Sequence, residues 1–141
     1  MNGSDSPSGA AQVLRRLQAA INKSDIDAFV ECFSPSYRSE QPVHPNRAFG
    51  GYDQVRKNWS AMFLEIPDLQ AEILAESIDG PKVWSEWRWA GTRADGAAFE
   101  MRGVTIMGIA AGVIEWARLY MEPVEQQSAD IDEAVRSLTK G

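Results

Sequence analysis

Two side chains that can exchange protons lie close together in the segment between residues 39 and 47. Glu40 falls in a short extended stretch, and His44, the single histidine of the chain, follows in a loop between Pro42 and Pro45. A carboxylate among apolar groups loses hydration, which favours its protonated form, and an imidazole exchanges protons near neutral pH. The pair therefore suits general acid–base catalysis, with Glu40 as the catalytic base or acid and His44 as its helper.

The same two residues also fit a purely structural role. Glu40 could face solvent at a sheet edge or pair with Arg38 or Arg47, and His44 could be an exposed loop residue. Cys32, the only cysteine, falls on the apolar side of a predicted helix and is expected to serve packing. Because there is one histidine and no carboxylate cluster at ligand spacing, we expect no metal and no cofactor.

Three consecutive segments alternate between apolar and charged residues. They cover residues 83–89, 99–102 and 116–122, and in each of them charged or aromatic side chains occupy every second position. Side chains of a strand point alternately to its two faces, so this pattern predicts three antiparallel strands with one apolar and one charged face. The opposite facing, with Glu86, Arg88, Arg118 and Tyr120 inside, is the alternative.

The apolar face is expected to line a pocket for an apolar, cyclic small molecule. The candidate substrate-binding residues combine this face with neighbouring aromatic positions: Tyr37, Trp59, Phe63, Trp87, Trp89, Phe99, Met101, Leu119 and Met121. The simpler interpretation is that Trp59, Trp87 and Trp89 fill the core and leave no open cavity.

The charged face has a composition that is typical of an interface. It combines exposed aromatic residues with charges of both signs on neighbouring strands: Trp84, Trp116 and Tyr120 with Glu86, Arg88, Glu100, Arg102, Arg118 and Glu122. Arginine and aromatic side chains are enriched in protein interfaces, so a homodimer through this face is expected, against the alternative of a solvated surface.

Helical spacing appears before the strands and again at the end of the chain. Apolar periodicity predicts helices from residue 13 to Asn22, from Ser24 as N-cap to a stop at Pro35, and over residues 53–64, followed by a strand over 69–78. This order gives an α+β class, in which a curved, mostly antiparallel sheet wraps around N-terminal helices and a pocket lies between them. Residues 1–9 are expected to be a disordered leader, 10–124 the domain, and 125–141 a tail with a short helix.

Length and charge exclude several classes of protein. A chain of 141 residues suits one domain, and its formal charge of −6 disfavours nucleic acid or an anionic membrane as partner. Neither a signal peptide nor an apolar run of membrane-spanning length is present in this sequence. A cytoplasmic protein is the expectation.

Five short phrases resemble the nuclear transport factor 2-like superfamily, and within it the SnoaL-like and ketosteroid-isomerase-like branch. Their order and spacing carry the resemblance over nearly all of residues 11–124: Ala20-Ile-Asn-Lys-Ser-Asp-Ile-Asp-Ala-Phe-Val-Glu-Cys-Phe33, Gly51-Tyr-Asp-Gln-Val-Arg-Lys-Asn-Trp59, Ile66-Pro-Asp68, Ala90-Gly-Thr92 and Gly112-Val-Ile-Glu115. The resemblance implies a cone-shaped, often dimeric fold with a pocket between sheet and helices. It does not imply one reaction, because this superfamily hosts isomerases, cyclases, epoxide hydrolases, dehydratases and non-catalytic domains.

The departures from the family argue against its best-known mechanisms. Leu119 stands where SnoaL-like cyclases and epoxide hydrolases place a working aspartate, and Leu17 where ketosteroid isomerases place an oxyanion-binding tyrosine. Trp87 and Trp89 align with an Arg and Asp pair of the epoxide hydrolases. Glu40 is the position with usable chemistry, at or next to the site of the isomerase base.

The sequence therefore leads to one expectation with two alternatives. The expectation is a cofactor-independent SnoaL-like enzyme that isomerises, cyclises or dehydrates an apolar, cyclic molecule by general acid–base catalysis. The first alternative is a binding or scaffold domain that kept the cavity and lost the chemistry. The second is an epoxide hydrolase-like activity with a rearranged set of acids.

Overall fold

The computed structural model describes residues 6–140. The helices within this range are α1 (Ser6–Asn22), α2 (Ile26–Glu31), α3 (Tyr52–Glu65) and α4 (Ile131–Thr139), with a short 3-10 helix at Pro45–Arg47. The strands are β1 (Phe33–Glu40), β2 (Phe49–Gly50), β3 (Gln70–Asp79), β4 (Lys82–Thr92), β5 (Ala98–Ala110) and β6 (Val113–Pro123). The predicted α+β class is confirmed.

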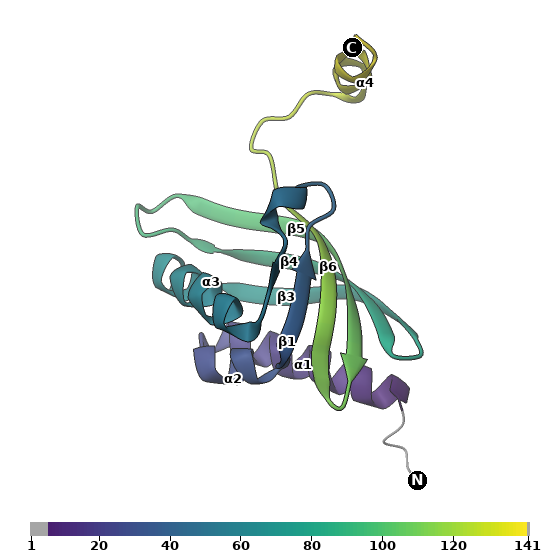
Figure 1. The fold of residues 1–141 in the computed structure, drawn as a ribbon. Coiled ribbons are helices and arrows are strands. Elements are labelled where there is room, and N and C mark those ends of the chain that lie inside the picture. The colour runs from purple at the N-terminus through teal and green to yellow at the C-terminus, as the bar shows by residue number, and fades with distance from the viewer. Residues whose placement is uncertain (1–5, 141) are drawn as a thin grey trace.

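One curved sheet forms the body of the molecule. Its strand order is β2-β1-β6-β5-β4-β3, and among these pairs β1 and β6 run parallel while the others are antiparallel. The sheet curls around α1, α2 and α3, which cover one of its faces (Figure 1). The two faces of the sheet therefore have different surroundings, one packed against helices and one open.

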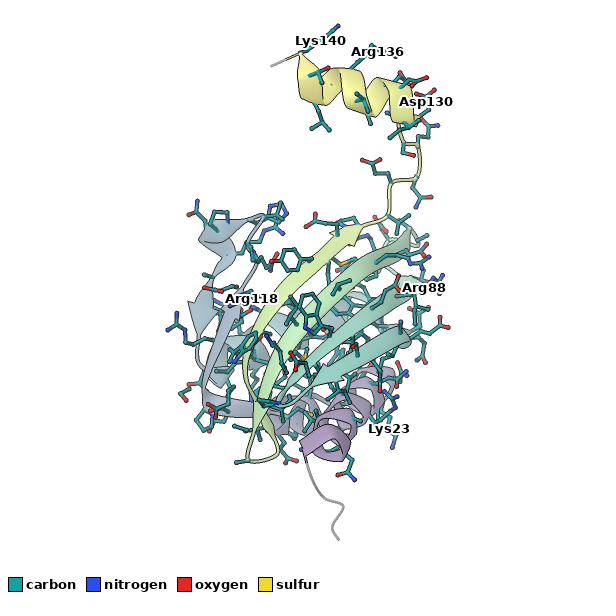
Figure 2. The ribbon with its side chains drawn as sticks, turned by 90° about the vertical axis from the view of Figure 1, so that its right-hand side faces the viewer. Lys23, Arg88, Arg118, Asp130, Arg136 and Lys140 are labelled. Carbon is teal, nitrogen blue, oxygen red and sulfur yellow. The ribbon has the colours of Figure 1, made fainter. Side chains whose placement is uncertain are left out.

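The register of β4, β5 and β6 decides which side chains face the helices. Trp87 lies opposite Gly103, which lies opposite Met121, and Ser85, Thr105 and Leu119 form the next row. Trp87 and Trp89 are 1% and 7% exposed on the inner face. Arg88 and Arg118 lie on the outer face (Figure 2), where their side chains are 42% and 46% exposed. The predicted facing of the three strands is confirmed, and the reversed facing is wrong.

Helix α1 is fastened to β3, the strand at one edge of the sheet. The Asn22 side chain accepts from the backbone N–H of Ala71 at 2.6 Å and donates to its carbonyl oxygen at 3.2 Å. Gln18 donates to the same carbonyl at 3.1 Å. These bonds occupy edge-strand backbone groups and hold the buried face of α1 against the sheet.

Local details differ from the sequence analysis at two helices. Asp25, not Ser24, caps α2, because its carboxylate accepts from the N–H of Ala28 at 3.1 Å. This helix ends at Glu31, and Pro35 lies inside β1 rather than stopping the helix. Helix α1 begins at Ser6, so residues 6–9 of the expected disordered leader are helical, and residues 1–5 lie outside the described residues.

The tail after β6 contains α4, which lies away from the sheet at the end of an extended segment (Figure 1). No helix in the described part of the chain combines the length and apolarity needed to cross a bilayer.

Candidate functional site

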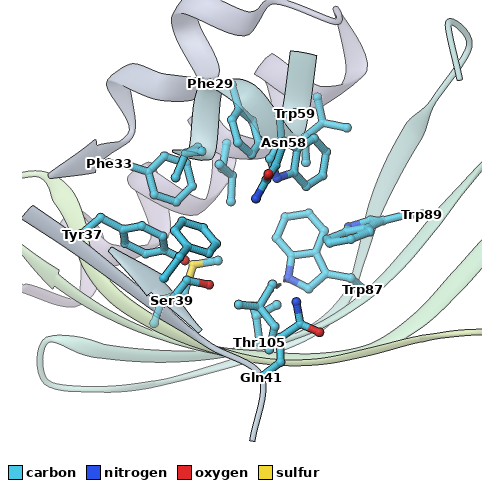
Figure 3. A pocket seen from close by; sticks show the side chains of 16 residues that line it. Phe29, Phe33, Tyr37, Ser39, Gln41, Asn58, Trp59, Trp87, Trp89 and Thr105 are labelled. Atoms are coloured by element: carbon cyan, nitrogen blue, oxygen red, sulfur yellow. Dashed lines mark hydrogen bonds between the residues drawn. The ribbon is translucent and has the colours of Figure 1, made fainter. Parts of the chain in front are cut away.

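A cavity lies between the inner face of the sheet and the three helices that cover it (Figure 3). Its volume is about 100 Å³. For comparison, an engineered cavity of about 150 Å³ holds benzene, and pockets for drug-sized ligands span roughly 300–1,000 Å³. The lining residues are Leu17, Ile21, Phe29, Phe33, Tyr37, Ser39, Gln41, Phe49, Val55, Asn58, Trp59, Trp87, Trp89, Thr105, Met107 and Leu119. The space suits a compact guest.

Of the nine side chains predicted to bind substrate, the structure brings five to this cavity. These are Tyr37 from β1, Trp59 from α3, Trp87 and Trp89 from β4, and Leu119 from β6. The indoles of Trp59 and Trp89 pack edge to face, with ring centroids 5.3 Å apart and planes at 78°. The three tryptophans therefore wall the cavity without filling it.

The other four predicted lining residues lie outside the cavity. Phe63 packs against Trp59, with centroids 5.7 Å apart, on the α3 side of the core. Phe99, Met101 and Met121 face inward, but Phe99 and Met101 lie opposite Gly91 and Trp89, nearer the β4–β5 hairpin than Trp87. The guanidinium of Arg93 covers the Phe99 ring at 5.0 Å. The structure therefore does not bring these four side chains to the cavity. For the three strand residues, side-chain alternation predicts the face of the sheet but not the position along the strand.

Glu40 and His44 also lie outside the cavity. Tyr37 and Ser39 point inward from the second half of β1 and are each 4% exposed, so the next residue, Glu40, points outward. Its carboxylate lies 3.5 Å from Arg118 Nε on the outer face. The His44 ring contacts Glu122 of β6, with 2.8 Å between Nε2 and Oε2. The structure therefore does not bring the predicted acid–base pair to the cavity lining.

Four polar residues that the sequence analysis did not single out line the cavity instead: Ser39, Gln41, Asn58 and Thr105. Ser39 follows Tyr37 by two residues on a strand, and Asn58 follows Val55 by three on a helix, so each shares a face with a buried neighbour. This spacing from a buried neighbour was the sequence signal that could have identified Ser39 and Asn58 as lining residues. The lining thus combines aromatic walls with hydroxyl and amide groups.

A small hydrogen-bonded cluster holds Trp87 deep in the cavity wall. Its Nε1 donates to Ser85 Oγ at 2.9 Å and to Thr105 Oγ1 at 3.1 Å, and the two hydroxyl oxygens lie 2.9 Å apart. All three residues are 1% exposed. Trp89 differs, because its Nε1 is buried without a hydrogen-bond partner in the described part of the chain. Aromatic packing, rather than hydrogen bonding, therefore fixes Trp89.

Tyr37 is the one ionisable side chain in this lining. Burial raises its pKa to about 12, against the opposing effect of a hydrogen bond from Ser39. The phenol therefore stays protonated at neutral pH and can act as a hydrogen-bond donor.

Neither a cysteine thiol nor a metal site accompanies this cavity in the described residues. Burial raises the pKa of the Cys32 thiol, and its Sγ contacts the Ala28 carbonyl oxygen at 3.4 Å within the helix–strand junction. Among residues 6–140, no group of three or more His, Cys, Asp or Glu side chains is placed to hold a metal ion.

The raised pKa of Tyr37 predicts a loss of stability at high pH. The unfolded chain releases this proton from about pH 10, whereas the folded protein keeps it to about pH 12. The contribution of Tyr37 to the free energy of unfolding is therefore fully present below pH 10 and decreases between pH 10 and 12, by roughly 2–3 kcal/mol. Urea unfolding of the wild type and of Tyr37→Phe across this range measures the difference. We expect a shallower decline in the variant, and parallel curves would contradict the assignment.

The comparisons with known proteins agree with this geometry. The family model for the SnoaL-like domain matches residues 14–118. No curated protein sequence matches the chain. Solved structures are similar in fold at low identity, which shows the fold alone.

Three of these structures illustrate the range of proteins that share this fold. A proposed SnoaL-like polyketide cyclase from Jannaschia sp. CCS1 is 18% identical, with 100% of this chain and 97% of that chain covered and a TM-score of 0.70. A proposed ketosteroid isomerase from Kribbella flavida is 13% identical, with coverages of 92% and 88% and a TM-score of 0.68. An LEH-like epoxide hydrolase from M. tuberculosis is 15% identical, with coverages of 82% and 84% and a TM-score of 0.71.

The resemblance to the nuclear transport factor 2-like superfamily is thereby confirmed, since the family match includes both the helices that cover the cavity and most of the strands that line it. The chain belongs to the SnoaL-like domain family.

Proposed function

We propose that this protein binds a compact, uncharged, mostly apolar cyclic molecule in the cavity walled by Trp59, Trp87 and Trp89. The observation that carries the proposal is the chemistry of the lining, which holds aromatic rings, hydroxyls and amides but no carboxylate, imidazole or cationic side chain. A charged guest would lose hydration there without gaining an opposite charge. Flat or ring-shaped guests gain contact with the indole faces.

The five tryptophans give this proposal a direct test with an internal control. Trp59, Trp87 and Trp89 line the cavity, whereas Trp84 and Trp116 lie on the outer face. We expect toluene or cyclohexanone to shift the indole N–H signals of the first three in ¹H–¹⁵N NMR spectra and to leave the other two in place. Shifts confined to Trp84 and Trp116, or no shift at millimolar probe, would contradict the proposal.

A second candidate is an isomerase or cyclase that uses Tyr37 as its proton donor. The observation in its favour is that this phenol lines the cavity and stays protonated, so it can donate to a carbonyl oxygen that gains charge as an enol-like species forms. A general base is missing from the lining, because Glu40 and His44 lie elsewhere. Binding without turnover is therefore the better-supported function.

Isomerisation of 3-cyclohexenone to the conjugated 2-cyclohexenone separates the two candidates. The probe is small and cyclic, and the conjugated product is followed by its ultraviolet absorbance. We expect no rate above that of buffer, because no base in the cavity can take the α-proton. A rate enhancement that Tyr37→Phe abolishes, while toluene still shifts the three cavity indoles, would establish the enzyme instead.

An epoxide hydrolase-like activity lacks support in this lining. Opening an epoxide requires a positioned water and an acid that protonates the departing oxygen. The lining contains no carboxylate, and Glu40 and Glu122 are engaged on the outer side by Arg118 and His44. A rearranged set of acids is therefore not found at the cavity.

We also propose that the outer sheet face joins two copies of the chain. Trp84 and Tyr120 are 45% and 37% exposed on this face. The Trp116 ring lies over Gly108, where any Cβ would overlap the indole, and carries the Arg118 guanidinium at 5.0 Å. A two-fold interface must be complementary to itself, and a patch with aromatic groups and charges of both signs meets that requirement.

Replacing the most exposed tryptophan of this face tests the dimer. We expect the wild type to sediment as a dimer and Trp84→Glu as a monomer, because the carboxylate would be buried against an apolar neighbour. Leu64→Glu, at an 82% exposed position on α3, is the matched control and should leave the dimer intact. Monomeric wild-type protein in analytical ultracentrifugation would refute the assignment.

A further inference from the structure

We propose that the side-chain amides of Gln41 and Asn58 at the mouth of the cavity select a guest that carries a hydrogen-bond acceptor, with cyclic carbonyl compounds as the class that fits. This inference rests on the proposed function, since it specifies the chemistry of the molecule held in the same cavity. Both residues line the cavity and are its most solvent-accessible polar groups.

The orientation of the Gln41 amide is fixed by Arg47. Arg47 Nη1 donates to Gln41 Oε1 at 3.0 Å. A guanidinium has donors and no acceptor, so the amide oxygen must be the atom that faces it. The Gln41 nitrogen is then turned to the other side, and Figure 3 shows it directed into the cavity.

The Asn58 amide lies on the opposite wall and is hydrogen bonded to Gln54. Gln54, one helical turn earlier on α3, donates through Nε2 to Asn58 Oδ1 at 2.7 Å. The Asn58 nitrogen is left on the cavity side, pointing inward between the aromatic rings (Figure 3). Two amides on different elements thus present N–H groups to the same space.

Two of the deeper polar groups of the lining are already engaged with one another. Trp87 Nε1 and Thr105 belong to the cluster with Ser85, whereas the buried Tyr37 phenol keeps its proton and remains a donor deeper in the cavity. Trp89 Nε1 is fully covered and out of reach of a guest. Among the described lining residues, the amide nitrogens of Gln41 and Asn58 are therefore the accessible donors at the mouth of the cavity.

These amide donors determine which functional group the guest must carry. A carbonyl oxygen has two lone pairs and carries no charge, so it can accept from amide N–H groups while its ring lies against the indoles. A guest of the same shape without an acceptor would cover the N–H groups and leave them unpaired. Arg47 acts as a positioning residue, because it orients the Gln41 amide without lining the cavity itself.

A pair of isosteric probes tests the inference. Cyclohexanone and methylenecyclohexane differ in replacing C=O by C=CH₂, and NMR titration of the Trp59, Trp87 and Trp89 indole signals gives both dissociation constants. We expect the ratio of the two affinities to fall roughly 2- to 10-fold in Gln41→Met and in Asn58→Leu, through weaker cyclohexanone binding alone. Gln126→Met, in the exposed tail, is the control and should keep the wild-type ratio.

The same titration distinguishes the failure of this inference from failure of the proposed function. If neither probe shifts the cavity indoles in the wild type, the binding function itself is refuted. If both bind and the ratio is the same in all variants, only the role of the amides is refuted.

The positioning role of Arg47 has its own test. Arg47→Ala should lower the ratio of the two affinities, and Arg47→Lys, whose ammonium can donate to the same oxygen, should restore it. An unchanged ratio in Arg47→Ala would remove Arg47 from the assignment.

Discussion

The hydrogen bonds from the Trp87 indole to Ser85 and Thr105 allow the largest side chain of the cavity wall to be buried completely. An indole N–H left without a partner in an apolar interior would cost free energy, so the two hydroxyls stabilise the buried position. Both hydroxyls lie on the inner face of the sheet, on β4 and β5, and their residues are directly opposite each other across the two strands. The cavity depends on this arrangement, because Trp87 then provides a fixed wall against which Trp89 packs, and Trp59 packs in turn against Trp89.

A second constraint separates charge from the cavity. Alternation along β4, β5 and β6 sends the ionic side chains to the outer face, where Arg88 pairs with Glu100 at 2.8 Å and Arg118 with Glu40 at 3.5 Å. Charges remain hydrated there, whereas the inner face retains neutral groups only. A neutral, aromatic interior favours recognition of shape and of a hydrogen-bond acceptor over proton transfer. For this reason binding, rather than acid–base chemistry, is the function that the geometry supports best.

His44, which the sequence analysis predicted to be catalytic, makes a structural contact in the folded chain. His44 contacts Glu122 on β6, and Arg47 holds the Gln41 amide, so the segment after β1 is tied to the sheet at one end of the cavity. That segment carries one of the two polar groups at the mouth. Arg47 thus acts on the site from outside the cavity, through its hydrogen bond to Gln41.

The sequence by itself determined the fold class, the order of helices and strands, and the faces on which Trp87, Trp89 and Arg88 lie. These properties follow from side-chain periodicity along one element, which is local information. Only the tertiary structure decided that Glu40 pairs with Arg118, that His44 reaches Glu122, and that Phe99, Met101 and Met121 lie beyond the cavity. It also placed Gln41 and Asn58 at the same mouth. Each of these outcomes depends on register and on packing between segments far apart in the chain, and the spacing of residues within one segment carries no information about either.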